Sequence, residues 1–349
     1  MRSEPMILKW LMTAAIGASV SGAALAAGDP FDPNYEPPRM ADGTPSFEGI
    51  WTNASLTVLE RADQVPNLVV SEPVAQMIAS YWLGRIQEDS KPLDPNAPAP
   101  EIGGDTGEGY DTFWIDIGDS VAKIDGEYRS SWIVEPESGK LPWRQDFRAN
   151  VLGPRFASTQ RFDNPEIRSA GERCTVGYGG TGGAPMLNVL YNNHYQFVQT
   201  PETVAIHVEM NHNTRLVRIG DEHVPASMPK WLGDSVGEWE GDTLVVETRH
   251  FHPGNTLRGA IRHFMYLSPE AEVVERFTRV SDDEILYQFT VDDPDVYTQP
   301  WSAEMVFVKA DGPIYEYACH EGNYSLPGIL AGARREEADA ATGGGGAED

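Results

Sequence analysis

Short segments rich in valine, isoleucine, phenylalanine and tyrosine follow one another from residue 110 to residue 318 of this 349-residue chain. In many of them apolar and polar residues alternate, which is the period of a half-buried β-strand. The segments are FWIDI, YRSSWIVE, YQFVQ, VAIHVEM, RLVRI, TLVVETR, EVVERFTR, EILYQFTV, AEMVFVKA and IYEYA. The chain is therefore expected to be mainly β.

Turn-forming residues join neighbouring segments at positions 240–242, 281–283 and 311–312, closely enough for hairpins. Parallel pairing would need crossovers of a dozen or more residues, for which this half of the chain has no room. A large antiparallel sheet hides its edges by closing or by folding onto a second sheet. We predict an antiparallel sheet closed into a calycin or lipocalin-like barrel, in preference to a sandwich.

One helix is predicted near the N-terminal end, over residues 72–87, with Pro73 suited to its first turn. Its apolar residues at helical spacing are Val74, Met77, Ile78, Tyr81, Trp82 and Ile86. The predicted organisation is an extended lead-in over residues 27–46, a single mainly β domain over 47–335 with a helical and loop insertion at 72–109, and a disordered tail over 336–349.

The first 26 residues have the pattern of a secretory signal peptide. Arg2 and Lys9 precede a run of small and apolar residues, and Ala24-Leu25-Ala26 forms a cleavage pattern. A membrane anchor, the alternative, would need about 20 strongly apolar residues, whereas this run contains serine, threonine and glycine. We predict a periplasmic protein without membrane association after cleavage. The oligomeric state is left open.

The charge balance bears on the partners. The chain has 53 acidic and 26 basic residues and a net charge of -27, which repels a phosphate backbone. Nucleic acid is therefore not expected as a partner. We predict a small-molecule substrate instead.

Two cysteines, Cys174 and Cys319, are expected to form a disulfide in an oxidising compartment. The bond would close a loop of about 145 residues and contribute ~4–5 kcal/mol in the chain-entropy model. The alternative makes Cys319 a nucleophile or a metal ligand beside His320.

Polar chemistry is concentrated in residues 203–223, which hold three of the eight histidines. Strand alternation places His207, Glu209 and Asn211 on the face opposite the apolar residues of this segment. His212 and Arg215 flank the following turn and His223 follows the next strand, so a hairpin is expected to bring the two imidazoles together. The predicted catalytic residues are His212, Arg215, His223, His320, Glu209 and Glu321, with Arg173, Tyr324, Asn323 and Trp231 as substrate-binding residues.

The chemical reason for this choice is proton transfer. A histidine beside a carboxylate is a suitable general acid or base near neutral pH, and arginine offers a fixed fork for a substrate carboxylate. The alternative is structural, because buried arginine, glutamate and histidine commonly tie loops to the ends of a sheet.

Metal and cofactor motifs are weak or absent from the sequence. His250 and His252, or His207 and Glu209, place two possible ligands on one strand face, but no third or fourth ligand can be assigned. The glycine-rich residues 177–183 lack the Lys-Ser/Thr of a phosphate loop, and neither G-x-S-x-G nor H-E-x-x-H occurs. We predict no metal and no organic cofactor.

Several long strings resemble a large family of exported bacterial proteins of unknown function, abundant in sphingomonads and acidobacteria. They are WLGDSVGEWEGDTLVVET at 231–248, VERFTRV at 274–280, YQFTVDDPDVYTQPW at 287–301 and YEYACHEGNY at 315–324. The resemblance covers residues 47–335, with departures at 110–111, 213 and 218–223. Separately, Gly49-Ile50-Trp51 is similar to the Gly-x-Trp opening of lipocalin-like barrels.

Two functional hypotheses of different class follow. The first is a cofactor-independent lyase, such as a decarboxylase, for a small aromatic organic acid, since the family it resembles occurs in bacteria that live on aromatic and plant-derived carbon. The second is a non-catalytic periplasmic barrel that binds a small molecule. Metal-dependent hydrolysis is a third and weaker alternative.

Overall fold

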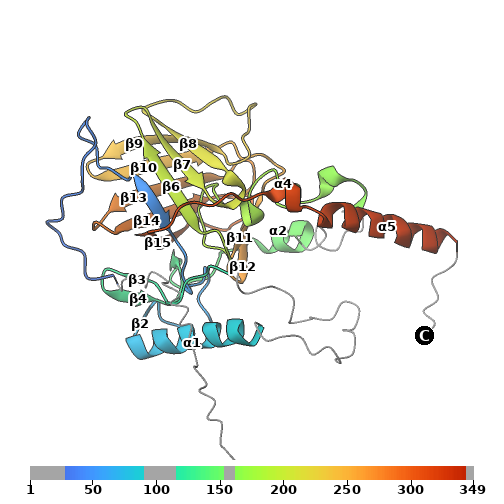
Figure 1. The fold of residues 1–349 in the computed structure, drawn as a ribbon, viewed down its shortest axis with the longest axis horizontal. Coiled ribbons are helices and arrows are strands. Elements are labelled where there is room, and N and C mark those ends of the chain that lie inside the picture. The colour runs from blue at the N-terminus through green and yellow to red at the C-terminus, as the bar shows by residue number, and fades with distance from the viewer. Residues whose placement is uncertain (1–27, 90–114, 153–161, 343–349) are drawn as a thin grey trace, which may run out of the picture.

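Nine strands close into a β-barrel (Figure 1). The structure is a computed structural model and describes residues 28–89, 115–152 and 162–342. In barrel order the strands are β1 (Gly49–Thr52), β6 (His194–Gln199), β7 (Thr203–Val208), β8 (Thr214–Ile219), β9 (Asp234–Glu240), β10 (Thr243–Arg249), β13 (Glu272–Arg279), β14 (Glu284–Asp292) and β15 (Trp301–Lys309). β1 pairs with both β6 and β15, which closes the ring. The prediction of a barrel rather than a sandwich is confirmed.

The pairing of β8 with β9 is parallel, whereas the other neighbours in the ring are antiparallel. Strand direction must return to its starting sense around a closed ring, so an odd number of strands cannot alternate throughout. Residues 220–233 carry the chain back outside the barrel as a crossover without a helix. The expectation of an entirely antiparallel sheet is therefore wrong at this pair, because a long loop replaces the crossover helix.

Seven of the predicted segments, from YQFVQ to AEMVFVKA, form β6, β7, β8, β10, β13, β14 and β15. YRSSWIVE is divided between β4 (Glu127–Arg129) and β5 (Ile133–Glu135). Strand β5 pairs with the first residues of β15. Residues 115–117 of FWIDI and the whole of IYEYA are not strands, and residues 311–312 do not form a hairpin. Residues 115–117 and IYEYA have no partner strand within the described structure to satisfy their backbone groups.

The barrel interior is filled by apolar side chains from alternating positions of the strands. On β7, Val204, Ile206 and Val208 are fully buried, while the residues between them are partly exposed. Aromatic rings pack across the interior, with centroids 4.8 Å apart for Phe277 and Tyr287 and 5.1 Å apart for Tyr195 and Phe307. The lumen is thus a packed core.

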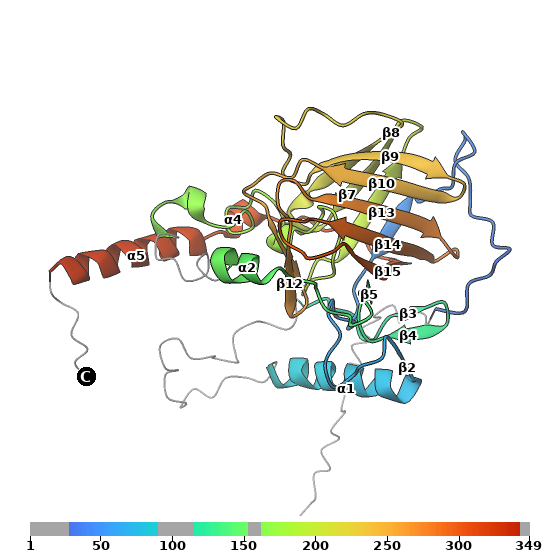
Figure 2. The same cartoon turned by 180° about the vertical axis from the view of Figure 1, so that it is seen from behind.

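Helix α1 (Glu72–Asp89) lies beside the small sheet of β2 (Val69–Val70), β4 and β3 (Lys123–Ile124), below the barrel (Figures 1 and 2). Trp82 and Ile86 pack against a second cluster that contains Leu56 and Ile117. The predicted helix is confirmed, although Met77 and Tyr81 of its apolar stripe are 60% and 53% exposed. The remaining elements are β11 (Leu257–Ala260), β12 (His263–Tyr266), α2 (Gln145–Phe147) and the short turns Arg148–Leu152, Pro165–Ile167, Tyr178–Gly180 and Met210–His212.

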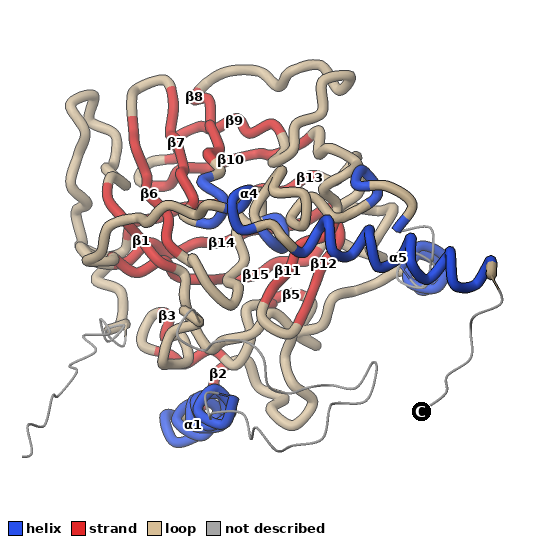
Figure 3. Tube along the Cα trace, turned by 45° about the vertical axis from the view of Figure 1, so that its right-hand side comes forward, coloured by secondary structure: helices blue, strands red, loops and turns tan. Residues whose placement is uncertain are grey.

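After β15 the chain crosses the outside of the barrel and ends in two helices, α4 (Cys319–Gly322) and α5 (Ser325–Ala341) (Figure 3). We call residues 310–322 the C-terminal strap. Helix α5 projects away from the barrel (Figure 1). Residues 336–341 belong to this helix, so the prediction of a disordered tail over 336–349 is wrong for them. The predicted signal at 1–26, residues 90–109 of the insertion and the last seven residues lie outside the described part.

Within the described ranges, none of the helices combines the length and the apolar character needed to cross a membrane.

Candidate functional site

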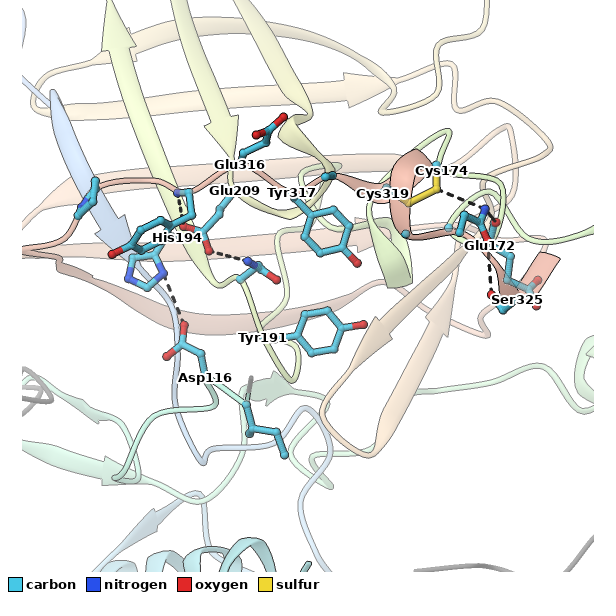
Figure 4. A pocket seen from close by; sticks show the side chains of 18 of the residues that line it. Asp116, Glu172, Cys174, Tyr191, His194, Glu209, Glu316, Tyr317, Cys319 and Ser325 are labelled. Atoms are coloured by element: carbon cyan, nitrogen blue, oxygen red, sulfur yellow. Dashed lines mark hydrogen bonds and ion pairs between the residues drawn. A yellow bond between two sulfur atoms is a disulfide. The ribbon is translucent and has the colours of Figure 1, made fainter. Parts of the chain in front are cut away.

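A groove of about 730 Å³ lies between one end of the barrel and the C-terminal strap (Figure 4). Its walls come from residues 115–116, the loop at 171–174, the chain leading into β6, the end of β7, and the strap with the first residues after it. A volume of this size is typical of small-molecule sites in proteins. The groove is therefore the principal candidate site.

Glu209 is the buried carboxylate of the groove, with 5% of the residue exposed. Strand β7 ends at Val208, and Glu209 itself has helical backbone angles, φ -58° and ψ -45°. Its side chain therefore leaves the alternation of the strand. It accepts hydrogen bonds from Asn192 Nδ2 at 2.6 Å and from the backbone N–H of Tyr315 at 3.1 Å. Glu209 thus connects the barrel to the strap.

His194 lies next to Glu209, since the Glu209 N–H donates to the His194 carbonyl at 3.0 Å, and its ring faces Asp116 (Figure 4). His194 Nδ1 lies 3.5 Å from Asp116 Oδ2. Burial raises the pKa of the Asp116 carboxyl; His194 opposes this effect, and the charge of Glu209 adds to it. An imidazole beside a carboxylate can accept or donate a proton, so this pair has the chemical groups that proton exchange with a bound molecule would need.

Tyrosines supply the aromatic surface of the groove. Tyr191 and Tyr317 both line the groove (Figure 4). Tyr315, on the strap, is 70% exposed. Aromatic faces of this kind suit apolar rings or cationic groups.

The predicted disulfide between Cys174 and Cys319 is confirmed, and it lies in the lining of the groove. Asn323 Nδ2 donates to the Glu172 carbonyl at 2.8 Å, which adds a second link between the two segments. The bond and this hydrogen bond together hold the C-terminal segment against residues 172–174. The alternative of a nucleophilic or metal-binding Cys319 is wrong, because its sulfur is bonded.

The expected meeting of His212 and His223 does not occur. His212 lies in the turn before β8 and His223 follows its end, so the two flank opposite ends of a strand that is about 20 Å long. A hairpin brings together the residues on either side of its turn and not the far end of the second strand. The expected arrangement of these imidazoles around one arginine is therefore wrong.

Arg215 lies inside the barrel and not at the groove. Its guanidinium pairs with Glu275, with Nη1 2.9 Å from Oε2. His223 is held outside β8 and β9, where its ring nitrogens lie 2.9 Å from Asp234 Oδ2 and 2.9 Å from Glu247 Oε1. Both residues have structural partners that account for their positions.

In addition to Glu209, Asn323 lines the groove, whereas the other predicted site residues do not. His320 and Glu321 are exposed on α4, and Tyr324 is 84% exposed. Arg173 donates to the Glu166 carbonyl at 3.3 Å. Trp231 stacks on His252 at the end of the crossover, with ring centroids 3.9 Å apart.

The weak metal candidates are also separated from the groove. His252 accepts from the Gly254 N–H, and His250 lies 5.7 Å from the His223 ring. His207 contacts Thr214, and it does not share a strand face with Glu209 because β7 has ended. In the described parts of the chain, no three histidine, cysteine, aspartate or glutamate side chains gather closely enough to hold a metal.

The sequence analysis missed Asp116, Asn192 and His194. Asp116 lies in FWIDI, whose sequence predicts a strand, and His194 directly precedes the YQFVQ segment. A histidine at the start of one strand beside a glutamate at the end of its predicted hairpin partner was a usable signal. Asp116 could not be placed in this way, because no turn joins it to those strands.

No protein-family model and no curated protein matches the chain. Among solved structures, part of it is similar to the crystal structure of a mutant of the fluorescent protein UnaG, at 13% identity over 34% of this chain and 72% of that chain, with a TM-score of 0.21. The assignment of the barrel rests on the strand pairings described above.

Proposed function

We propose that this chain is an exported, periplasmic protein that binds a small molecule in the groove beneath the C-terminal strap. One observation carries the proposal: the groove gathers a carboxylate, an imidazole, an amide and tyrosine rings from segments far apart in the sequence. The packed barrel interior serves as the scaffold that holds them. Export is supported by the pattern of residues 1–26 and by the disulfide, since disulfides persist in oxidising compartments.

The test is to fill the groove by substitution. Gly322 lines it, and a Cβ added there meets nothing within 4 Å. Gly322→Trp should therefore fold and obstruct the groove. Gly328→Trp on α5 is the matched control, because a Cβ there also meets nothing and the residue does not line the groove.

The measurement is a small-molecule library screened by native mass spectrometry. Compounds that bind the wild type and Gly328→Trp, but not Gly322→Trp, would support the proposal. Failure of the whole library to bind, or equal binding by all three proteins, would contradict it.

A second candidate function is proton-transfer catalysis in the same groove, as in a lyase. The observation that favours it is the His194–Asp116 pair at 3.5 Å. The described lining contains no lysine or arginine, so a substrate carboxylate would lack the guanidinium fork expected from the sequence. His194→Gln should abolish turnover of any compound found in the screen while leaving its binding measurable; unchanged turnover would exclude this candidate.

A further inference from the structure

We propose that the groove selects a small organic cation, an amine or quaternary ammonium group attached to an apolar or aromatic body. This inference rests on the proposed function and names the ligand class of the same site. Four carboxylates line the groove, from Asp116, Glu172, Glu209 and Glu316, and the lining within the described residues has no lysine or arginine. Glu172 pairs with Arg168 outside the groove, and the Glu316 side chain points away from it (Figure 4). Asp116 and Glu209 face the hollow, where the imidazole of His194 is the basic side chain of the described lining.

Glu209 is the most deeply buried of these carboxylates. Its oxygens accept from the Asn192 amide and the Tyr315 backbone N–H, neither of which carries a charge. A buried carboxylate without a countercharge is costly in a medium of low dielectric. A ligand cation would supply that countercharge.

Asp116 provides a second and independent element. Its Oδ2 is buried and accepts no hydrogen bond within the described structure, with His194 Nδ1 at 3.5 Å as its ionic neighbour. The raised pKa of Asp116 is caused first by burial and is increased by the charge of Glu209, so the two carboxylates repel each other when both are charged. A cation between them would relieve that repulsion.

Geometry favours an organic cation over a metal ion. The described acidic and imidazole side chains do not converge in a group of three that could ligate a metal. An ammonium group on a larger body needs no such convergence, because its charge can be shared among separated carboxylates and ring faces. Tyr191 and Tyr317 provide those faces, and a cation over a tyrosine ring gains about 0.5–2 kcal/mol of binding free energy.

The overall charge acts in the same direction. A net charge of -27 produces a negative field that raises the local concentration of cations and repels anions. The effect weakens as salt is added, which offers a separate readout.

The experiment uses three probes that share a phenyl ring and differ in charge: phenethylamine, 2-phenylethanol and 3-phenylpropanoate. Binding to the full mature chain is followed by isothermal titration calorimetry or ligand-observed NMR at pH 7 and low ionic strength. We expect the amine to bind at least about tenfold more tightly than the alcohol, the anion not to bind, and the preference to fall with added salt.

Glu209→Gln and Asp116→Asn should each weaken amine binding about tenfold while leaving the affinity for the alcohol unchanged. Glu238→Gln, an exposed carboxylate on β9, is the control and should leave amine binding unchanged. The variants keep the shape of each side chain, and circular dichroism checks that they fold.

Each contrary result has a definite meaning. Equal or tighter binding of the alcohol or the anion would overturn the cation class, while the proposed groove function would stand. Amine binding that survives both carboxylate variants would overturn it as well. If none of the three probes binds, the cation class falls, and the library screen with Gly322→Trp decides the groove function separately.

Discussion

Arg215 and Glu275 form a salt bridge in the interior of the barrel, with Nη1 2.9 Å from Oε2 and the side chains 1% and 0% exposed. The Tyr287 hydroxyl donates to Glu275 Oε1 at 2.7 Å and accepts from the Met186 N–H at 2.9 Å. Burial raises the pKa of Tyr287 well above its ordinary value, and the charge of Glu275 adds to that. The network connects β8, β13 and β14 through polar groups in an apolar core.

Removing one partner of this pair should be strongly destabilising. Arg215→Met leaves Glu275 buried without a countercharge, and we expect it to lower the free energy of unfolding by about 3–5 kcal/mol. The double variant Arg215→Met/Glu275→Gln should recover much of the loss, because no charge is left and the amide still offers an acceptor to Tyr287. Urea unfolding measures both.

Arg276→Met on the neighbouring residue of β13 is the control for this experiment. Arg276 is 41% exposed and pairs with Glu240, so its loss should cost less than about 1 kcal/mol. An Arg215→Met protein as stable as the wild type would contradict the structural role assigned to this pair.

The position of Arg215 shows where sequence patterns fail. The segment RLVRI predicts a strand, and β8 is one, but Arg215 faces the interior while Leu216 is 56% exposed. A pattern of apolar and polar residues predicts that an arginine faces the solvent. The glutamate that neutralises Arg215 lies on β13, and no short-range sequence pattern shows that β13 and β8 contribute to the same interior. The strand was predictable from the sequence, and the direction of its side chains was not.

The Asp234 carboxylate clamps the crossover that makes the parallel pairing possible. It is 0% exposed and accepts from Arg218 and Lys230, from His223 and from the Val224 N–H. Burial alone would raise the pKa of Asp234, but these donors lower it far below its ordinary value. The lowered pKa means that the clamp stabilises the fold above about pH 4 and that this contribution is lost as the pH falls further.

Asp234→Asn should therefore cost about 2–3 kcal/mol at pH 7, less than the ~3–5 kcal/mol of a fully buried pair, because Arg218 and Lys230 are partly exposed. The variant should also lose stability less steeply than the wild type below pH 4. Unfolding free energies from pH 2.5 to 7 measure both effects. Asp221→Asn, which removes an exposed partner of Arg218, should have a much smaller effect; equal effects of the two substitutions would contradict the clamp.

The candidate site was predicted in part. The disulfide, Glu209 and Asn323 came from the sequence, because cysteine pairing and the proximity of the two strands flanking a turn are local or countable features. Asp116 and His194 belong to segments about 80 residues apart in the sequence. These segments meet only in the closed barrel, where β1, which contains Trp51, pairs with β6. Sequence spacing has no information about such a meeting, since it depends on the register of the whole ring.

The disulfide should stabilise the wall of the groove more than the barrel. Cys174 and Cys319 join two segments outside the closed ring, and the strap has few backbone hydrogen bonds to the strands, among them Ala310 N–H to the Ile50 carbonyl. We expect Cys174→Ser/Cys319→Ser to raise hydrogen exchange in residues 310–324 at least about tenfold, and by a larger factor than in β6 to β15. Addition of a dithiol reductant to the wild type should have the same effect and none on the variant. Unchanged exchange in the strap would show that its other contacts suffice.

Asp116 gives a pH dependence of opposite sign to that of Asp234. Because its pKa is raised in the folded protein, the native state binds its proton more tightly than the unfolded chain does. Stability then falls as the pH rises from the unfolded pKa of about 3.9 to the higher folded pKa, and the penalty persists above that window. Asp116→Asn should remove the penalty, so the variant should be at least as stable as the wild type at pH 7. The difference between the two proteins should shrink toward pH 3.5, as thermal unfolding across the acidic range would show. A wild type that is more stable than the variant at neutral pH would mean that His194 lowers the Asp116 pKa by more than burial and Glu209 raise it.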